Sequence, residues 1–329
     1  MYSSQTFRLD SNNVVRYIPN EHIRTVAVYA EKIEFDAWFD TNNLGFVDNQ
    51  DYGKTDDMKE KYYAFIGDSF VTGHGVGPWI PELRDNIQAA NSTIEIYNLG
   101  VDGIGVEQFY GLLKSASEQI KITNIVMLPI SNDFYRQLWY PLTTNEEIRF
   151  CPISLDPKKC AKGSYIIRVI NGDASQEEIL DITREMKKNG NRYVGNQANR
   201  RKSLWEYSHL YLFVKRSYLD IYGTQYSPED KSVKRSLAAL KNIRELFPDA
   251  EISLIHLPEK GEVAKHKYSL EIRQQIEELG IKYYPALTDC EWSTDMFWRN
   301  DAHPNRLGYT CISSCVYNYL FREENSSGE

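Results

Sequence analysis

Long apolar runs are absent from this chain of 329 residues. No stretch approaches the roughly eighteen apolar residues of a membrane-spanning helix, so any anchor must lie outside this sequence. Residues 1–13 also contain no apolar segment of the signal-peptide kind. The compartment stays open, and of the two choices an extracytoplasmic location (periplasmic or secreted) is favoured over a cytoplasmic one.

A surplus of basic residues is lacking as well. The chain has 38 Lys and Arg against 46 Asp and Glu, which gives a net charge of −8. Such a charge repels phosphate backbones, and no cluster of Lys and Arg is dense enough to reverse this locally. We therefore expect no nucleic-acid partner. The composition leaves the oligomeric state open.

Cysteine is scarce and is not arranged for a metal. The five cysteines show neither the Cys-x-x-Cys nor the Cys/His spacing of a tetrahedral zinc site, so we expect no structural metal. Cys151 and Cys160 bracket a proline-containing loop and could form a disulfide, while free buried thiols are an equal alternative. The glycine-rich segment 73–77 lacks the full dinucleotide fingerprint, so we expect no nucleotide cofactor either.

Short apolar runs recur from residue 62 onward, as expected of parallel strands that are covered on both faces. They lie at residues 62–66, 93–97, 124–130, 251–257 and 281–285. Helix signals lie between them, such as the cap and proline at 227–230 before the periodic stretch 233–247. This alternation predicts an α/β layer architecture in which ligands bind beyond the carboxyl ends of the strands.

Three segments lie outside that alternation. Residues 1–60 are rich in β-branched and aromatic residues and predict a β-rich lead-in that packs on the main domain, 61–322. Residues 134–226 form a long polar and aromatic insertion, which could act as a lid. The polar tail 323–329 is expected to be disordered.

The strongest local signal for chemistry is Gly67-Asp68-Ser69, directly after the first apolar run. A serine at the carboxyl end of a strand exposes its hydroxyl at the functional edge of the sheet. Backbone N–H groups at the start of the following helix can stabilise an oxyanion there. Ser69 is therefore the candidate nucleophile.

A serine hydroxyl is a poor nucleophile until a base removes its proton. The segment Asn300-Asp301-Ala302-His303-Pro304 supplies a histidine, and Asp301 is near enough in sequence to bond its imidazole. We assign His303 as base and Asp301 as its orienting acid. Pro304 is expected to open the last helix.

Two further segments follow predicted strands and offer hydrogen-bond donors. Gly103 ends the run Asn98 to Gly103 and can present its N–H without a side chain in the way. Asn132 follows the third apolar run and can donate from its amide. Together with the N–H of Ser69, these residues make a candidate oxyanion hole.

These four blocks, in this order, resemble those of the SGNH hydrolases, also called GDSL esterases. The resemblance spans roughly residues 62–309 and implies a flavodoxin-like, three-layer α/β/α sandwich on a five-stranded parallel sheet. It also implies Ser69 as nucleophile, Ser69, Gly103 and Asn132 as oxyanion donors, and His303 with a nearby aspartate as base and acid. No cofactor is needed for this chemistry.

The expected function is hydrolysis of acyl esters, acetyl esters first, of a carbohydrate or small lipid through an acyl-enzyme. Trp139 and Trp298 are candidates for a substrate wall, because their rings give flat apolar platforms for sugars and they lie close in sequence to Asn132 and His303.

Two alternatives remain. The first is an O-acetyltransferase acting on a bacterial surface polysaccharide, which could require a membrane-associated partner as donor. The second is a carbohydrate-binding module without catalysis, although such a module has no need of an activated serine.

Overall fold

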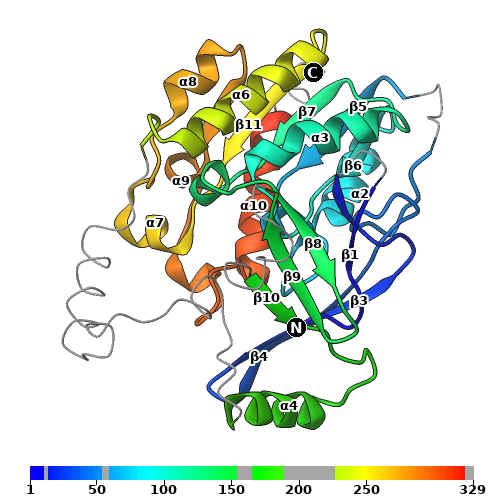
Figure 1. Ribbon diagram of the computed structural model, residues 1–329. Coiled ribbons are helices and arrows are strands. Elements are labelled where there is room, and N and C mark those ends of the chain that lie inside the picture. Colours follow the sequence, from blue (N-terminus) through cyan, green and yellow to red (C-terminus); the bar gives the residue numbers. More distant parts are fainter. Residues whose placement is uncertain (11–13, 54–58, 154–164, 189–226, 323–329) are drawn as a thin grey trace.

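A parallel sheet forms the centre of the computed structural model, which describes residues 1–10, 14–53, 59–153, 165–188 and 227–322 (Figure 1). The strands lie in the order β12-β11-β7-β5-β6 and all neighbouring pairs are parallel. Their bounds are Lys61–Ile66 for β5, Ile94–Asn98 for β6, Asn124–Met127 for β7, Glu251–His256 for β11 and Lys282–Pro285 for β12. This order confirms the predicted flavodoxin-like sheet.

Helices cover both faces of the sheet because residues along each strand alternate between the two faces. On β5, Tyr62, Ala64 and Ile66 pack with residues of α3 (Val106–Ser117) and α6 (Lys231–Leu246). Tyr63 and Phe65 belong to a second core cluster, with residues of α2 (Ile80–Ala90) and α10 (Arg306–Leu320). The predicted three-layer sandwich is therefore present.

Shorter helices connect these layers. They are α1 (Ser69–Thr72), η1 (Ser131–Phe134), α7 (Lys260–Lys265), α8 (Arg273–Glu278), α9 (Ala286–Asp289) and η4 (Thr294–Met296). Pro304 does not open the last helix as expected. α10 begins at Arg306, because the side chain of Asn305 caps it by accepting from the N–H groups of Leu307 and Gly308.

The N-terminal segment forms two antiparallel hairpins, β1 (Phe7–Leu9) with β2 (Val15–Tyr17) and β3 (His22–Tyr29) with β4 (Lys32–Asp40). Their aromatic residues Phe7, Tyr17 and Phe39 join the core cluster that includes one face of the parallel sheet. A buried ion pair at 2.8 Å joins Asp48, which follows these hairpins, to Arg84 on α2.

The insertion contributes a three-stranded antiparallel sheet that the sequence did not predict. It contains β8 (Trp139–Thr143), β9 (Glu147–Pro152) and β10 (Tyr165–Arg168), followed by α4 (Gln176–Lys188). The Arg24 guanidinium on β3 donates to the carbonyl groups of Gly172 and Ala174, so the insertion lies against the N-terminal hairpin (Figure 1). Residues 154–164 and 189–226 of the insertion, and with them the test of a lid, lie outside the described residues.

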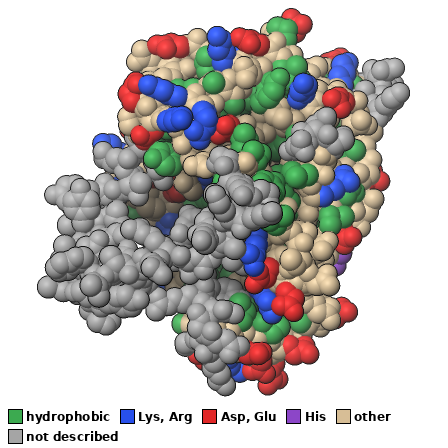
Figure 2. All heavy atoms as spheres, in the orientation of Figure 1, with side chains coloured by type: hydrophobic (Ala, Val, Ile, Leu, Met, Phe, Trp, Pro, Cys, Tyr) green, Lys and Arg blue, Asp and Glu red, His purple; other side chains and the backbone are tan. Residues whose placement is uncertain are grey.

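A disulfide joins Cys290 to Cys315, a pair that the sequence did not single out. The pairing of Cys151 with Cys160 involves a residue outside the described ranges. None of the described helices is long and apolar enough to cross a membrane. On the described part of the face in Figure 2, basic and acidic side chains are interspersed rather than separated.

Candidate active site

Ser69 lies at the carboxyl end of β5 and is the first residue of α1. Asp68 caps this short helix by accepting from the N–H of Phe70 at 2.9 Å. Gly67 allows the tight turn, because a Cβ at this position would lie 2.4 Å from the Val71 side chain and 2.9 Å from the Leu128 carbonyl. The Ser69 side chain is thereby fixed at the edge of the sheet.

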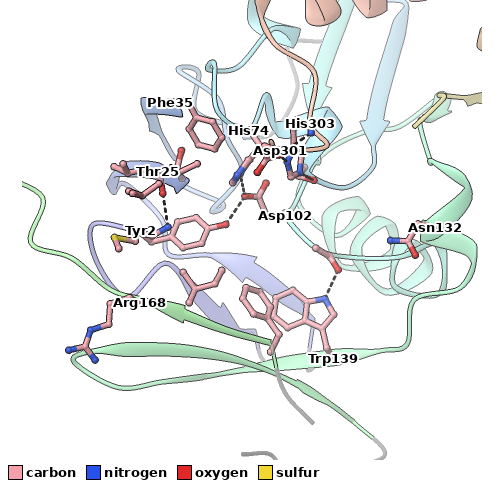
Figure 3. Close-up of a pocket in the computed structure, with 18 of the residues that line it drawn as sticks. Tyr2, Thr25, Phe35, His74, Asp102, Asn132, Trp139, Arg168, Asp301 and His303 are labelled. Carbon is pink, nitrogen blue, oxygen red and sulfur yellow. Dashed lines mark hydrogen bonds and ion pairs between the residues drawn. The ribbon is translucent and has the colours of Figure 1, made fainter. Parts of the chain in front are cut away.

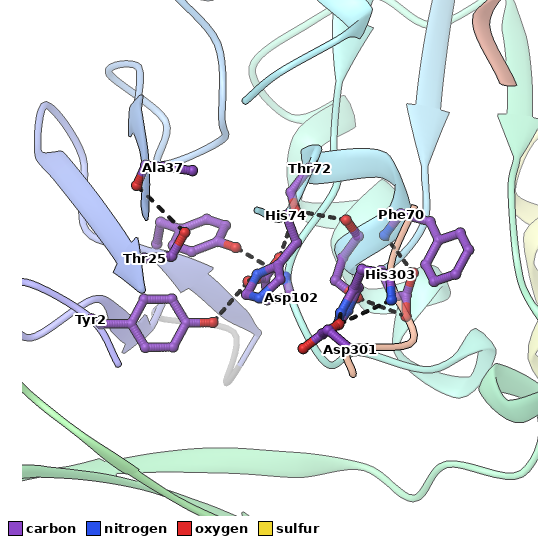
Figure 4. Close-up of polar contacts among 12 residues, drawn as sticks. Tyr2, Thr25, Ala37, Phe70, Thr72, His74, Asp102, Asp301 and His303 are labelled. Carbon is purple, nitrogen blue, oxygen red and sulfur yellow. Dashed lines mark hydrogen bonds and ion pairs between the residues drawn. The ribbon is translucent and has the colours of Figure 1, made fainter. Parts of the chain in front are cut away.

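His303 and Asp301 reach Ser69 from the loop before α10, which lies 234 residues further along the chain (Figure 4). The distance from His303 Nε2 to Ser69 Oγ is 2.8 Å, which is a hydrogen bond. The other ring nitrogen, Nδ1, bonds Asp301 Oδ1. The same carboxylate oxygen accepts from the backbone N–H of His303 at 2.9 Å, so Asp301 bonds both the ring and the backbone of His303.

Asp301 is the carboxylate that bonds the imidazole of His303, and the neighbouring Asn300 does not. The N–H and side-chain amide of Asn300 donate instead to Glu34. Burial alone would raise the pKa of Asp301, but its hydrogen bonds and the charge of His303 outweigh burial and hold that pKa below its usual range. Tyr29 on β3 donates to the second carboxylate oxygen at 3.0 Å. Asp301 is therefore a carboxylate at neutral pH.

A cavity of about 750 Å³ opens in front of Ser69 and His303 (Figure 3). Gly103 and Asn132 both line it, so the structure brings the two predicted donors to the same space as the serine. Gly103 has a φ of +77°, a conformation that favours glycine. Asn132 comes from η1, immediately after β7.

Arg136 joins three loops of this site and was not identified from the sequence. Its guanidinium donates to Asp68 at 2.9 Å and to the Ile104 carbonyl at 3.1 Å, and it lies 3.2 Å from Asp133. Burial opposes ionisation, yet the two carboxylates raise the pKa of Arg136 above its ordinary value. No motif marks such a residue, since its partners come from segments far apart in sequence.

A second imidazole was also missed. His74 bonds Asp102 through Nδ1 at 2.8 Å. Asp102 additionally accepts from Thr72 at 2.5 Å and from Tyr2 at 2.8 Å. Asp102 directly precedes Gly103, and His74 follows Ser69 by five positions, so adjacency to two predicted site residues was the available signal.

The two predicted wall residues differ in position. Trp139 lines the cavity, but its indole N–H donates to the Gly103 carbonyl at 3.0 Å and the side chain is largely buried against Phe150 (Figure 3). Trp139 therefore stabilises the Gly103 loop and offers little exposed ring surface to a substrate. Trp298 is not one of the described residues that line the cavity, and its backbone N–H bonds the His303 carbonyl at 3.0 Å.

Among the described residues, no group of three or more His, Cys, Asp and Glu is arranged to hold a metal ion. His256 is buried and bonded to Ser131 and Tyr283, and burial lowers its pKa to about 3. It is therefore a packed neutral histidine.

No protein-family model and no curated protein matches this chain. Solved structures do match it. The psychrotrophic esterase EstA from Pseudoalteromonas sp. is 13% identical, and the match covers 81% of this chain and 100% of that chain with a TM-score of 0.42. The acetylxylan esterase Axe2 from Geobacillus stearothermophilus is 12% identical over 80% of this chain and 95% of that chain, with a TM-score of 0.40.

Proposed function

We propose that this protein is a serine ester hydrolase of the SGNH type. The observation that carries the proposal is the 2.8 Å contact between Ser69 Oγ and His303 Nε2, in a histidine whose Nδ1 is bonded to Asp301. A hydroxyl, a neutral imidazole and a carboxylate in series are what a serine nucleophile requires. The cavity in front of them gives an ester access.

In the proposed reaction, Ser69 Oγ attacks the ester carbonyl while His303 Nε2 takes the hydroxyl proton. The tetrahedral intermediate carries its negative charge on the former carbonyl oxygen, toward which the N–H groups of Ser69 and Gly103 and the amide of Asn132 donate. Collapse breaks the bond to the alcohol, which leaves with the proton from His303. Water then attacks the acyl-Ser69 ester by the same route in reverse, and the acid is released.

Asp301 holds His303 in the tautomer that has its proton on Nδ1, which leaves Nε2 free to accept from Ser69. The low pKa of Asp301 supports this role, because the residue stays charged while the imidazole gains and loses its proton. A positioned base of this kind contributes about 10²- to 10⁴-fold to a rate. Asp301 acts by orientation and charge and does not itself take up the proton.

The substrate we propose is an acyl ester, acetyl first, of a carbohydrate or small lipid. The cavity of about 750 Å³ is much larger than an acetyl group, so a bulky alcohol portion would occupy most of it. Apolar and aromatic side chains from the hairpin β3–β4 and from the insertion line this space, namely Val26, Val28, Phe35, Trp139, Phe150 and Ile167. Such a lining suits a sugar face or an alkyl chain.

The test is hydrolysis of p-nitrophenyl acetate, butyrate and octanoate and of an acetylated xylo-oligosaccharide, each with and without an added acceptor glycan. The wild-type protein and Ser117→Ala, a serine in the last turn of α3, should hydrolyse at least one of these esters. Ser69→Ala should lose about 10³-fold or more of that rate. Product that forms only with acceptor would identify a transferase, and binding without any turnover would identify a binding module.

We also propose an extracytoplasmic location. The Cys290–Cys315 disulfide supports it, since disulfides persist mainly in oxidising compartments. Recovery of the native protein in the cytoplasmic fraction with both thiols reduced would contradict this.

A further inference from the structure

The three proposed oxyanion donors lie on three separate segments of the chain. Ser69 begins α1 after β5, Gly103 lies in the loop after β6, and Asn132 lies in η1 after β7. In each segment, the residue next to the donor contacts the same side chain, the guanidinium of Arg136. One side chain therefore links the three segments at the positions that adjoin the donors.

The contacts of Arg136 are made by one nitrogen, Nη1. It donates to Asp68 Oδ2 at 2.9 Å and to the Ile104 carbonyl at 3.1 Å, and it lies 3.2 Å from Asp133 Oδ1. The second carboxylate oxygen of Asp133 accepts from the N–H of Ile130 at 3.2 Å. Both aspartate side chains are fully buried, and Arg136 is 24% exposed. Charged hydrogen bonds that are shielded from water in this way hold their partners strongly.

The segments that carry Gly103 and Arg136 also approach each other closely. A Cβ on Gly105 would lie 2.7 Å from the Cβ of Arg136 and 2.7 Å from the Asp133 carbonyl oxygen. The carbonyl of Gly103 itself accepts from the indole N–H of Trp139 at 3.0 Å. The loop that carries this donor is thus tied on one side by Arg136 and on the other by Trp139.

We propose that Arg136 is a positioning residue that holds the three proposed oxyanion donors in the geometry that the reaction requires. The inference rests on the proposed function, because those donors serve the acyl transfer proposed above. Donors stabilise an oxyanion when they lie about 2.7–3.1 Å from the position that its oxygen will occupy. A displacement of about 1 Å can cost on the order of 10²-fold in rate. Ties at the neighbouring residues limit such displacements in all three segments.

Two substitutions separate the position of the donors from the charge of Arg136. Arg136→Gln removes the cation and leaves the carboxylates of Asp68 and Asp133 without it, so it changes both position and charge. Arg136→Lys keeps a positive charge beside these carboxylates. Its stem is shorter and its ammonium is a rotatable point charge instead of a planar fork, so it should hold the segments less rigidly. A loss of rate in Arg136→Lys therefore reports position.

The experiment measures kcat/KM for the ester of the panel above that the wild type hydrolyses fastest, together with the inhibition constant of 1-propaneboronic acid. A boronic acid forms a tetrahedral adduct on a nucleophilic serine with an oxygen in the oxyanion position, so its affinity reports the donors. Arg136→Gln should lower both kcat/KM and boronate affinity by about 10²-fold, and Arg136→Lys should lower both by about tenfold.

Arg149→Gln is the matched control. Arg149 on β9 also pairs with a carboxylate, Glu147, at 2.7 Å, and it is 31% exposed, but it is not one of the described residues that line the cavity. The control should change each quantity by no more than about twofold, because such a partly exposed ion pair contributes little. Near-UV circular dichroism establishes that each variant is folded, and if Arg136→Gln is not, Arg136→Lys decides.

The outcomes separate the inference from the proposed function. Wild-type kcat/KM and boronate affinity in Arg136→Lys overturn the inference, because charge alone would then suffice. A loss of kcat/KM with unchanged boronate affinity also overturns it, because this pattern means fewer active molecules with intact donors. A wild type that hydrolyses an ester without binding the boronate lacks the proposed donors and overturns it too. A wild type that neither hydrolyses any ester nor binds the boronate overturns the proposed function, and the inference with it.

Discussion

The edge of the parallel sheet and the wall that faces it are built by different means. At the edge, Ser69, His303 and Asp301 are fixed by hydrogen bonds of defined geometry, and the loops beneath them are joined by half-buried Arg136. The wall comes from the N-terminal hairpins and the insertion, and it meets the cavity mainly with apolar and aromatic side chains. The difference teaches that the sheet edge sets the chemistry, while the wall can set substrate size.

The largest effect is expected at the edge. His303→Gln should lower kcat/KM for any ester that the wild type hydrolyses by about 10³- to 10⁴-fold, because the hydroxyl of Ser69 loses its base. The unfolding midpoint should change little, since the side chain is 24% exposed. Asn300→Ala, in the same loop, should stay within about threefold of the wild type. An equal loss in both variants would mean that the loop, and not the imidazole, matters.

The second-largest effect is expected at the buried ion pair that joins Asp48 of the N-terminal segment to Arg84 on α2. Arg84→Met should destabilise the protein by about 3–5 kcal/mol, because it leaves the Asp48 carboxylate buried without its partner. Urea unfolding measures this. The double variant Arg84→Met/Asp48→Leu should recover most of the loss. A single variant as stable as the wild type would show that the N-terminal segment is not held through this pair.

A smaller effect is expected at the wall. Phe150 lies 4.5 Å from Trp139, ring centroid to centroid, and lines the cavity. Phe150→Ala should raise KM for the octanoyl ester by about tenfold, because truncation removes apolar contact of about 1.5–3 kcal/mol at most. The kinetics with the acetyl ester should change little. Equal losses with both esters would place Phe150 in support of the Gly103 loop rather than in substrate contact.

The smallest effect is expected on the stability of the protein in acid. It comes from His256, which is buried at the end of β11. Burial lowers the pKa of His256 from 6.5 to about 3, so below pH 6.5 the unfolded chain binds more protons than the folded one. Stability is therefore present above pH 6.5 and is lost as the pH falls, by about 1 kcal/mol between pH 6.5 and 5.5 for this residue. His256→Gln should unfold with a weaker pH dependence in this interval. An unchanged dependence would contradict the account of His256 as a buried neutral ring.

The difference between the sheet edge and the wall also explains which features the sequence could predict. Apolar runs and the residues that end them placed the five parallel strands and brought Ser69, Gly103, Asn132 and His303 to one edge, because strand ends in such sheets meet there. The wall strands β8–β10 were missed, since half-buried strands in an insertion carry no continuous apolar signal. Long-range partners were missed for a related reason: neither Arg136 with Asp68 nor His74 with Asp102 has a characteristic spacing.

The most direct test is mass spectrometry of the protein after exposure to a fluorophosphonate probe at pH 8. The account predicts a single adduct on the peptide that contains Ser69, lost in Ser69→Ala and strongly reduced in His303→Gln. An unreacted Ser69 in a folded wild-type protein, or labelling that His303→Gln leaves unchanged, would contradict it.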